Sequence, residues 1–295
     1  MKHIAVIGAG TMGNGIAHTF AQNGYKVNLI DIHNGALTKG IATITNNLDR
    51  MVLKNTISEA KKIETLSNIT CSNTLKEGVK DAVLVIEAAT ENRDLKLDLF
   101  KQLDANCSKD TILATNTSSI SITQIAAATV RPDKVIGMHF MNPVPIMPLV
   151  EIIKGYSTSH ATVQTIMDVS KSLGKTPIEV KDYPGFVANR ILMPMINESI
   201  ETLYNGVAGV QHIDTIMKLG MAHPMGPLQL ADFIGLDVCL SILNVMYNGF
   251  KNPKYAPCPL LVNMVAAGRL GIKSGEGFYD YSISKKAEHI AQPFL

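Results

Sequence analysis

Three features are scarce in this sequence, and each scarcity excludes a class of protein. There are only four cysteines, and no two have the C-x-x-C spacing of a zinc knuckle or a thioredoxin-type redox pair. The net charge is only +2 and no run of about five like charges occurs, so no nucleic-acid partner is expected. No apolar run approaches the roughly 20 residues of a membrane-spanning helix. We therefore expect no membrane partner and no metal ion.

The composition that is present favours a globular protein of two domains. The chain has 295 residues, of which 46% are hydrophobic and 18% charged, enough apolar material for more than one core. It starts directly with a strand-like segment and a glycine-rich turn, without the basic and apolar regions of a signal peptide. The cysteines are expected to be reduced and mostly buried, so a cytoplasmic location is predicted.

Short apolar runs alternate with amphipathic helical segments over the first 180 or so residues. This alternation predicts an α/β fold with a doubly wound, Rossmann-type parallel sheet. The expected strands are His3–Ile7, Val27–Asp31, Ala82–Glu87, Thr111–Thr115, Lys134–Phe140, Leu149–Ile153 and Ile178–Val180. The expected helices between them are Thr11–Asn23, Ala36–Lys54, Leu95–Asn106 and Ile120–Ala128.

A Pro-Gly pair at Pro184 and Gly185 marks the expected domain boundary. The sequence predicts a first domain over residues 1–183 and an all-α carboxyl-terminal domain over residues 184–295. Its expected helices are Phe186–Tyr204, Val210–Leu219, Pro227–Phe233, Asp237–Asn248 and Leu260–Ala267. The segment from Ser282 to Leu295 lacks periodicity and is expected to be a loose tail.

A G-x-G-x-x-G motif joins the first strand to the first helix and predicts a dinucleotide site. Its residues are Gly8, Gly10, Thr11, Met12 and Gly13 around Ala9. The glycines allow a pyrophosphate to approach the backbone at a helix N-terminus. Asp31 ends the second strand, where a carboxylate can accept hydrogen bonds from ribose hydroxyls and would repel a 2′-phosphate. NAD is therefore favoured over NADP, and FAD is disfavoured because no flavin-sheltering domain follows.

A histidine and a glutamate suggest acid–base chemistry at the same edge of the sheet. His139 lies at the end of its strand, and the three prolines that follow exclude a helix before the next strand. The chain should fold back and bring Glu151 beside His139, giving a base stabilised by a carboxylate. By spacing alone, a His and a Glu 12 residues apart are more often unrelated surface or core residues. Asn116 to Ser119 follow a neighbouring strand and can line this edge or cap the next helix.

Several segments together resemble the L-3-hydroxyacyl-CoA dehydrogenase family, and in particular its bacterial short-chain members. They are V-I-G-A-G-T-M-G from Val6, V-I-E-A-A-T-E from Val85, N-T-S-S from Asn116, G-M-H-F-M-N-P from Gly137, P-G-F-V-A-N-R from Pro184, H-P-M-G-P from His223 and K-S-G-E-G-F-Y-D-Y from Lys273. The resemblance covers nearly the whole chain. It implies NAD-dependent oxidation of (S)-3-hydroxyacyl-CoA to 3-oxoacyl-CoA, and the reverse, on short chains.

The resemblance also implies roles for individual residues. His139 is the implied catalytic base and Glu151 its partner, while Ser118 and Asn189 hydrogen-bond the reacting oxygens. Further implied NAD-site residues are Glu91, Lys96, Asn116, Asn142 and Lys273, with Ser118 shared with the substrate. Lys54 falls where the family has a basic residue near the CoA phosphates, although a lone lysine on a helix is equally typical of a solvated face. A homodimer through the helical domain is implied as well.

The sequence departs from the family pattern at three positions, and two other interpretations of its function are considered. Met141 stands where phenylalanine is common, Pro148 where lysine is common, and Asn47 where serine is common. One rival is another two-domain β-hydroxyacid dehydrogenase with a lysine base on the helix after the linker, but Phe186–Tyr204 contains no lysine. The other rival is a non-catalytic, crystallin-like relative, since a fold does not prove an activity.

Overall fold

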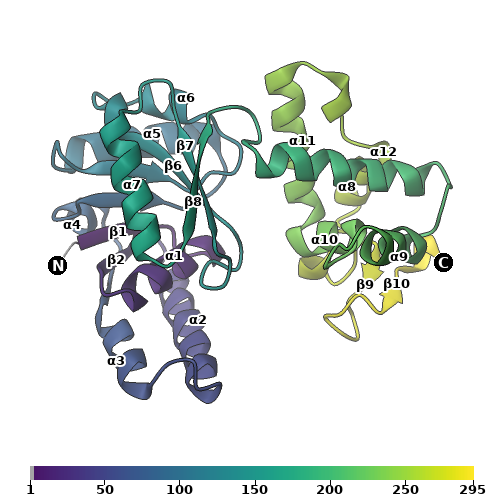
Figure 1. Cartoon of the computed structure of the whole chain (residues 1–295), viewed down its shortest axis with the longest axis horizontal. Coiled ribbons are helices and arrows are strands. Elements are labelled where there is room, and N and C mark those ends of the chain that lie inside the picture. Colours follow the sequence, from purple (N-terminus) through teal and green to yellow (C-terminus); the bar gives the residue numbers. More distant parts are fainter. Residues whose placement is uncertain (1–2) are drawn as a thin grey trace. The chain divides into compact units, whose positions relative to one another are not determined.

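The computed structural model describes residues 3–295, and the chain divides into two units, Met1–Tyr183 and Pro184–Leu295. In the first unit eight short, largely apolar segments pair into one sheet (Figure 1). Its strand order is β3 (Ile69–Ser72), β2 (Lys26–Ile30), β1 (His3–Ile7), β4 (Leu84–Glu87), β5 (Ile112–Thr115), β6 (Val135–Phe140), β7 (Leu149–Lys154) and β8 (Thr176–Lys181). All neighbours are parallel except β6 and β7.

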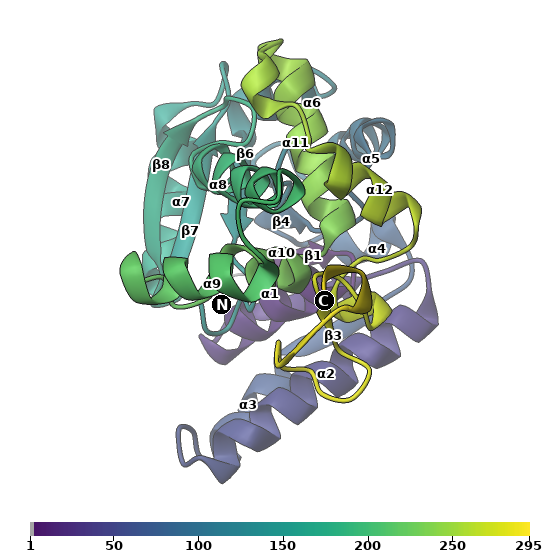
Figure 2. The ribbon, with the colours of Figure 1, turned by 90° about the vertical axis from the view of Figure 1, so that its right-hand side faces the viewer.

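Helices cover both faces of this sheet, which explains why β4 and β6 are buried at every residue. The helices of this unit are α1 (Thr11–Gln22), α2 (Asn34–Leu53), α3 (Glu59–Ser67), α4 (Leu75–Val79), α5 (Arg93–Asn106), α6 (Ile122–Ala126) and α7 (His160–Ser172), with a 3₁₀ turn, η1, at Pro132–Lys134. Figures 1 and 2 show α2 and α3 as a pair that projects beyond the sheet.

Residue alternation along the strands decides which side chains face which layer. Ile136, Met138 and Phe140 of β6 join the core cluster that also contains residues of α1 and α7. Because successive strand residues point to opposite faces, His139 lies on the other face of the sheet. Val150 and Ile152 of β7 join the same cluster, which places Glu151 on the face of His139.

The second unit is helical around its own core. It contains α8 (Ala188–Tyr204), α9 (Val210–Gly220), α10 (Pro227–Ile234), α11 (Leu236–Phe250) and α12 (Pro259–Ala266), with 3₁₀ turns η2 (Pro253–Tyr255), η3 (Ile272–Ser274) and η4 (Gln292–Phe294). Met193, Leu243, Met246 and Phe278 are fully buried in this core. The expected fold class, a doubly wound sheet followed by a helical part, is confirmed.

Two expectations about individual segments were incomplete or wrong. Helix α7 and the α3–β3–α4 segment were not predicted; α3 and α7 begin at serine caps, Ser58 and Ser159, that a search for capping residues would detect. The expected loose tail is instead tied down, because β10 (His289–Ile290) pairs antiparallel with β9 (Tyr279–Asp280) and Ala291 is fully buried. A two-residue strand has too few residues to show periodicity.

Among the described residues, no single helix combines the length and apolar character needed to cross a bilayer. Only α10 and α11, bent at 95° to one another, meet the criteria when the two helices are taken together.

Candidate active site

The glycine-rich turn between β1 and α1 has the geometry of an anion-binding loop. Gly8 has φ +94°, and a Cβ there would lie 2.6 Å from the carbonyl oxygen of Ala88. A Cβ on Gly13 would collide with the carbonyl of Gly8, whereas a Cβ on Gly10 would meet nothing within 4 Å. The start of α1 has no side-chain cap and no acidic residue in its first turn. The turn is therefore closely packed on the protein side, and its helix N-terminus suits a pyrophosphate.

Asp31 is fixed beside this turn, immediately after β2. Its Oδ2 accepts a hydrogen bond of 2.9 Å from the backbone N–H of Ala9, and its Oδ1 accepts one of 3.0 Å from His33. Its carboxylate thus stands at the carboxyl edge of the sheet, beside the loop that would hold the pyrophosphate. The residues of this edge therefore fit a dinucleotide such as NAD.

A buried ion pair, not anticipated as such from the sequence, underlies the same edge. Lys96 is only 2% exposed, and its Nζ lies 2.6 Å from Oε1 of Glu87 and 3.4 Å from Oε2 of Glu91. Glu87 is fully buried and also accepts a 2.6 Å hydrogen bond from the hydroxyl of Thr115. Glu87 was missed as a site residue, although an acid that ends an apolar strand was a usable signal. The role of Lys96 toward the cofactor stays a prediction.

Glu91 organises the loop that carries Ser118. Its Oε1 accepts hydrogen bonds from the Thr117 hydroxyl at 2.6 Å, the Ser118 backbone N–H at 3.0 Å and the Ser119 hydroxyl at 2.9 Å. Burial alone would raise the pKa of Glu91, but Lys96 and these donors outweigh it and hold the pKa below its ordinary value. An ionised Glu91 therefore fixes the conformation of the loop.

Asn116 joins two strand ends at this edge. Its side-chain Oδ1 accepts a 2.9 Å hydrogen bond from the backbone N–H of Phe140, the residue after His139. Asn116 therefore holds the loop after β5 against the end of β6. Asn142 comes two residues after Phe140 in the chain. Asn116, Ser118, His139 and Asn142 thus all follow or end neighbouring strands of one sheet edge.

His139 and Glu151 lie directly opposite each other in the antiparallel β6–β7 ladder. The Nδ1 atom of His139 is 2.8 Å from Oε2 of Glu151, and the two residues are 8% and 3% exposed. A ring that donates its Nδ1–H to the carboxylate carries its lone pair on Nε2. Such an imidazole can take up a proton at Nε2 while the carboxylate stabilises the cation that results. The arrangement can perform general acid–base chemistry.

The other predicted residues lie in different places. Lys54 caps the carboxyl end of α2, whose 20 residues put it about 30 Å along the helix from Asn34, away from the glycine-rich turn. In the second unit, Asn189 is 8% exposed and lies in the first turn of α8. Lys273, in η3, forms an ion pair with Asp237 of α11.

Two buried aspartates, also missed from the sequence, hold the segment after Lys273. Asp214 accepts hydrogen bonds from the backbone N–H of Leu228 at 2.8 Å and from the Tyr279 hydroxyl at 2.8 Å. Asp232 accepts from the backbone N–H groups of Phe278 and Tyr279 and from the Tyr281 hydroxyl. Burial, reinforced by the charge of Asp214, raises the pKa of Asp232 to about 7. This segment is therefore anchored to α9 and α10 by its two tyrosines.

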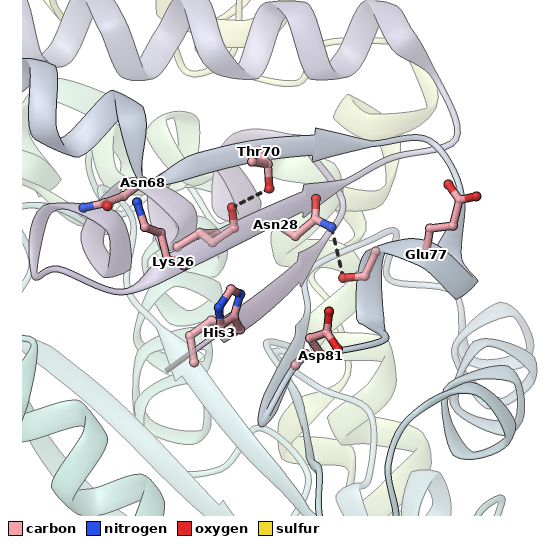
Figure 3. Close-up of a pocket in the computed structure, with 11 residues that line it drawn as sticks. His3, Lys26, Asn28, Asn68, Thr70, Glu77 and Asp81 are labelled. Atoms are coloured by element: carbon pink, nitrogen blue, oxygen red, sulfur yellow. Dashed lines mark hydrogen bonds between the residues drawn. The ribbon is translucent and has the colours of Figure 1, made fainter. Parts of the chain in front are cut away.

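A separate cavity of about 250 Å³ lies in the first unit but contains none of these residues. Its walls include His3 and Lys26, which begin β1 and β2, together with Glu77 and Asp81 (Figure 3). Asn28 donates a 3.1 Å hydrogen bond to the Gly78 carbonyl in its wall. The glycine-rich turn and Asp31 follow the opposite ends of these strands. Doubly wound sheets bind ligands at their carboxyl edge, so the cavity is not assigned to the active site.

The described residues contain no cluster of three or more His, Cys, Asp or Glu side chains that could hold a metal ion. The groups at the carboxyl edge are instead a nucleotide-binding turn, a histidine–carboxylate pair and polar loops. They define the class of this protein as a two-unit, dinucleotide-binding oxidoreductase.

Comparisons with known proteins give the family. Residues 3–183 match the family described as 3-hydroxyacyl-CoA dehydrogenase, NAD binding domain, and residues 185–281 match 3-hydroxyacyl-CoA dehydrogenase, C-terminal domain. The 3-hydroxybutyryl-CoA dehydrogenase of Clostridioides difficile is 53% identical over 279 residues, which cover 95% of this chain and 99% of that protein. The 3-hydroxybutyryl-CoA dehydrogenase of Bradyrhizobium diazoefficiens is 51% identical over 285 residues, 97% of each chain.

A solved structure agrees in both sequence and fold. The (S)-3-hydroxybutyryl-CoA dehydrogenase of Ralstonia eutropha superposes with a TM-score of 0.91 at 50% identity, over 95% of this chain and 99% of that one. The chain belongs to the 3-hydroxyacyl-CoA dehydrogenase family and is an NAD-dependent enzyme of that family.

Proposed function

We propose that this enzyme interconverts (S)-3-hydroxybutyryl-CoA and acetoacetyl-CoA, with His139 and Glu151 as its catalytic pair. The observation that carries the catalytic assignment is the buried 2.8 Å contact between these side chains at the sheet edge that holds the glycine-rich turn. The short-chain substrate is supported by the names of relatives that match nearly the whole chain.

In the proposed mechanism, Nε2 of His139 takes the proton of the C3 hydroxyl during oxidation. Glu151 stabilises the imidazolium that forms and keeps the ring in the orientation that exposes Nε2 to substrate. Bound NAD supplies the acceptor for the hydride that leaves C3. Ser118, held by Glu91, and Asn189 hydrogen-bond the reacting oxygens. In the reductive direction His139 donates the same proton to the forming alkoxide.

The cofactor would be held by Gly8 to Gly13 and Asp31, with Glu91, Lys96, Asn116, Asn142 and Lys273 along its length. Lys54 would make a solvent-screened contact with a phosphate of CoA. Residues 1–183 would form the NAD-binding domain and residues 184–295 the substrate and dimerisation domain. We further propose a cytoplasmic homodimer that acts in butyrate or fatty-acid metabolism, with no nucleic-acid or membrane partner.

The test is NADH oxidation with acetoacetyl-CoA. His139→Ala removes the proton donor and should lower kcat by about 10² to 10⁴ while NADH still binds. Glu151→Gln keeps the shape but removes the charge, so kcat should fall substantially with little change in KM. The control His212→Ala, an exposed position of α9, should behave as wild type. A His139→Ala enzyme that kept most of its turnover would refute the assignment.

A further inference from the structure

The segment between the two strands of the His139–Glu151 pair has few hydrogen bonds of its own. Residues 141–148 contain three prolines, which have no N–H to donate. Inside the segment, the backbone N–H groups of Ile146 and Met147 both donate to the carbonyl of Pro143. Most of the segment is exposed, so water can bond many of its carbonyl groups, but Val144 is buried, and a buried backbone acceptor needs a donor from elsewhere in the protein.

Lys175, the residue just before β8, supplies hydrogen-bond donors to the segment. Its ammonium group donates hydrogen bonds of 2.6 Å to the carbonyl of Val144 and 2.8 Å to that of Met147. The backbone N–H of Thr176 donates a third, of 2.7 Å, to the carbonyl of Pro148. Two consecutive residues, Lys175 and Thr176, thus donate hydrogen bonds to three carbonyl groups of the segment.

The Lys175 ammonium is held in an unusual environment for this residue type. Lys175 is only 8% exposed, and within residues 3–295 its hydrogen-bond acceptors are backbone carbonyls rather than carboxylates. Burial lowers the pKa of its ammonium group. A lysine that only contributed to solubility would keep its charge in water, since long basic side chains ordinarily do so.

The same segment contacts the cofactor-binding helix. Val144, whose carbonyl Lys175 binds, is 2% exposed and belongs to the core cluster that includes α1. A Cβ on Gly15 of α1 would lie 2.9 Å from Cβ of Val144, so the segment rests directly on the backbone of that helix. The segment also contains Asn142, a proposed NAD-site residue, and leads into β7, which carries Glu151.

We propose that Lys175 is a positioning residue, whose ammonium clamps residues 141–148 onto α1 and thereby fixes Asn142 for the dinucleotide. This inference rests on the proposed placement of NAD along Asn142, and it concerns cofactor binding rather than the proton transfer. A chain in which Lys175 is only a structural cation would lose stability without losing affinity for the cofactor.

The test compares Lys175→Met with a control of equal thermal stability. The control is Ile166→Val or Ile166→Ala, chosen to match the thermal midpoint; Ile166 is fully buried in α7, which packs on β7 and β8 without donating to the segment. NADH binding is measured by fluorescence without acyl-CoA. Lys175→Met should raise the Kd for NADH about tenfold, and the control should not. At saturating NADH, kcat should change less than about threefold.

Hydrogen exchange supplies a readout that does not depend on activity. Peptides that cover residues 141–148 should exchange faster in Lys175→Met than in the Ile166 control. Lys175→Arg keeps donors for both carbonyls and should hold the Kd for NADH within about threefold of wild type. If Lys175→Met does not fold, Lys175→Gln, which retains one amide group, is expected to give an intermediate Kd and partial exchange protection.

The proposal is overturned if Lys175→Met, or Lys175→Gln in its place, binds NADH as the control does, or if exchange of the segment is unchanged. These outcomes differ from a failure of the proposed function. In that case the wild type would bind NADH but would not reduce acetoacetyl-CoA, and the Lys175 comparison could still be made on NADH binding.

Discussion

Two glutamates at the sheet edge of the first unit, Glu87 and Glu91, face a lysine, whereas two buried aspartates of the second unit, Asp214 and Asp232, are held by uncharged donors. Glu87 and Glu91 share the ammonium of Lys96, and the pKa of Glu91 is held low. Asp214 and Asp232 are each 1% exposed, and their partners are tyrosine hydroxyls and backbone N–H groups. The pKa of Asp232 is accordingly raised to about 7.

The difference shows that burial by itself does not set the charge of a carboxyl group. In both units burial favours the neutral acid, and hydrogen-bond donors favour the anion. For Glu91 in the first unit, the positive charge of Lys96 adds to the donors and favours the ionised form. Glu91 at the sheet edge is therefore ionised at neutral pH, whereas Asp232 of the second unit titrates near neutral pH.

Removal of the shared cation should produce the largest effect. Lys96→Met leaves Glu87 buried without its counter-charge, which should lower the free energy of unfolding by about 3–5 kcal/mol. Urea unfolding at pH 7 measures the loss. The double variant Lys96→Met with Glu87→Gln removes both charges and should recover most of it. If the single and double variants were equally destabilised, the ion pair would not be the cause.

The titration of Asp232 should be visible as a pH dependence of the second unit. Its pKa is about 7 in the folded chain, against 3.8 for an unperturbed aspartate, so the folded state holds the proton more tightly between these two pH values. Stability should therefore fall as pH rises from about 4 to about 7, by at most about 1.4 kcal/mol per pH unit. Asp232→Asn should flatten this slope. Hydrogen exchange of peptides from residues 184–295 reports the change by unit, and an equal slope in the variant would contradict the assignment.

His18 gives the first unit a smaller dependence of the opposite sign. It is fully buried in α1, and burial lowers its pKa from 6.5 to about 4, with the Gln22 side chain only partly opposing this. The unfolded chain thus takes up a proton below pH 6.5 that the folded chain refuses until about pH 4. Stability of the first unit should fall as pH drops through this narrower window. His18→Gln should remove that fall.

The two pH effects together sharpen the comparison. Between pH 6.5 and 4, acid should loosen the first unit and stabilise the second, so exchange rates of peptides from the two units should move apart. Exchange rates that moved in parallel in the wild type, and remained parallel in His18→Gln and Asp232→Asn, would show that neither group governs the response of its unit.

Local features of the sequence predicted a large part of this architecture. The glycine motif, its flanking strand and helix, and Asp31 lie within about 30 residues, and each follows from backbone geometry or strand ends. The prolines after His139 predicted the return of the chain that places Glu151 in register. Only the antiparallel ladder decided that the two side chains lie on one face.

The missed features depend on partners that are remote in the chain. Lys96 is the exception, because its partners Glu87 and Glu91 are only nine and five residues away, and its burial follows from the packing of α5. Lys175 lies 31 and 28 residues from the two carbonyls it binds. Asp214 and Tyr279 are 65 residues apart. No periodicity or short motif carries such information.

The sequence by itself determined the fold class, the helical second part and the nucleotide-binding turn, because these arise from periodicity and from the conformations open to glycine and proline. Tertiary structure alone decided which charges are buried, which are paired and which titrate near neutral pH. The reason is physical: the ionisation of a buried group depends on the charges and donors within a few ångströms of it, and folding assembles that shell from distant parts of the chain.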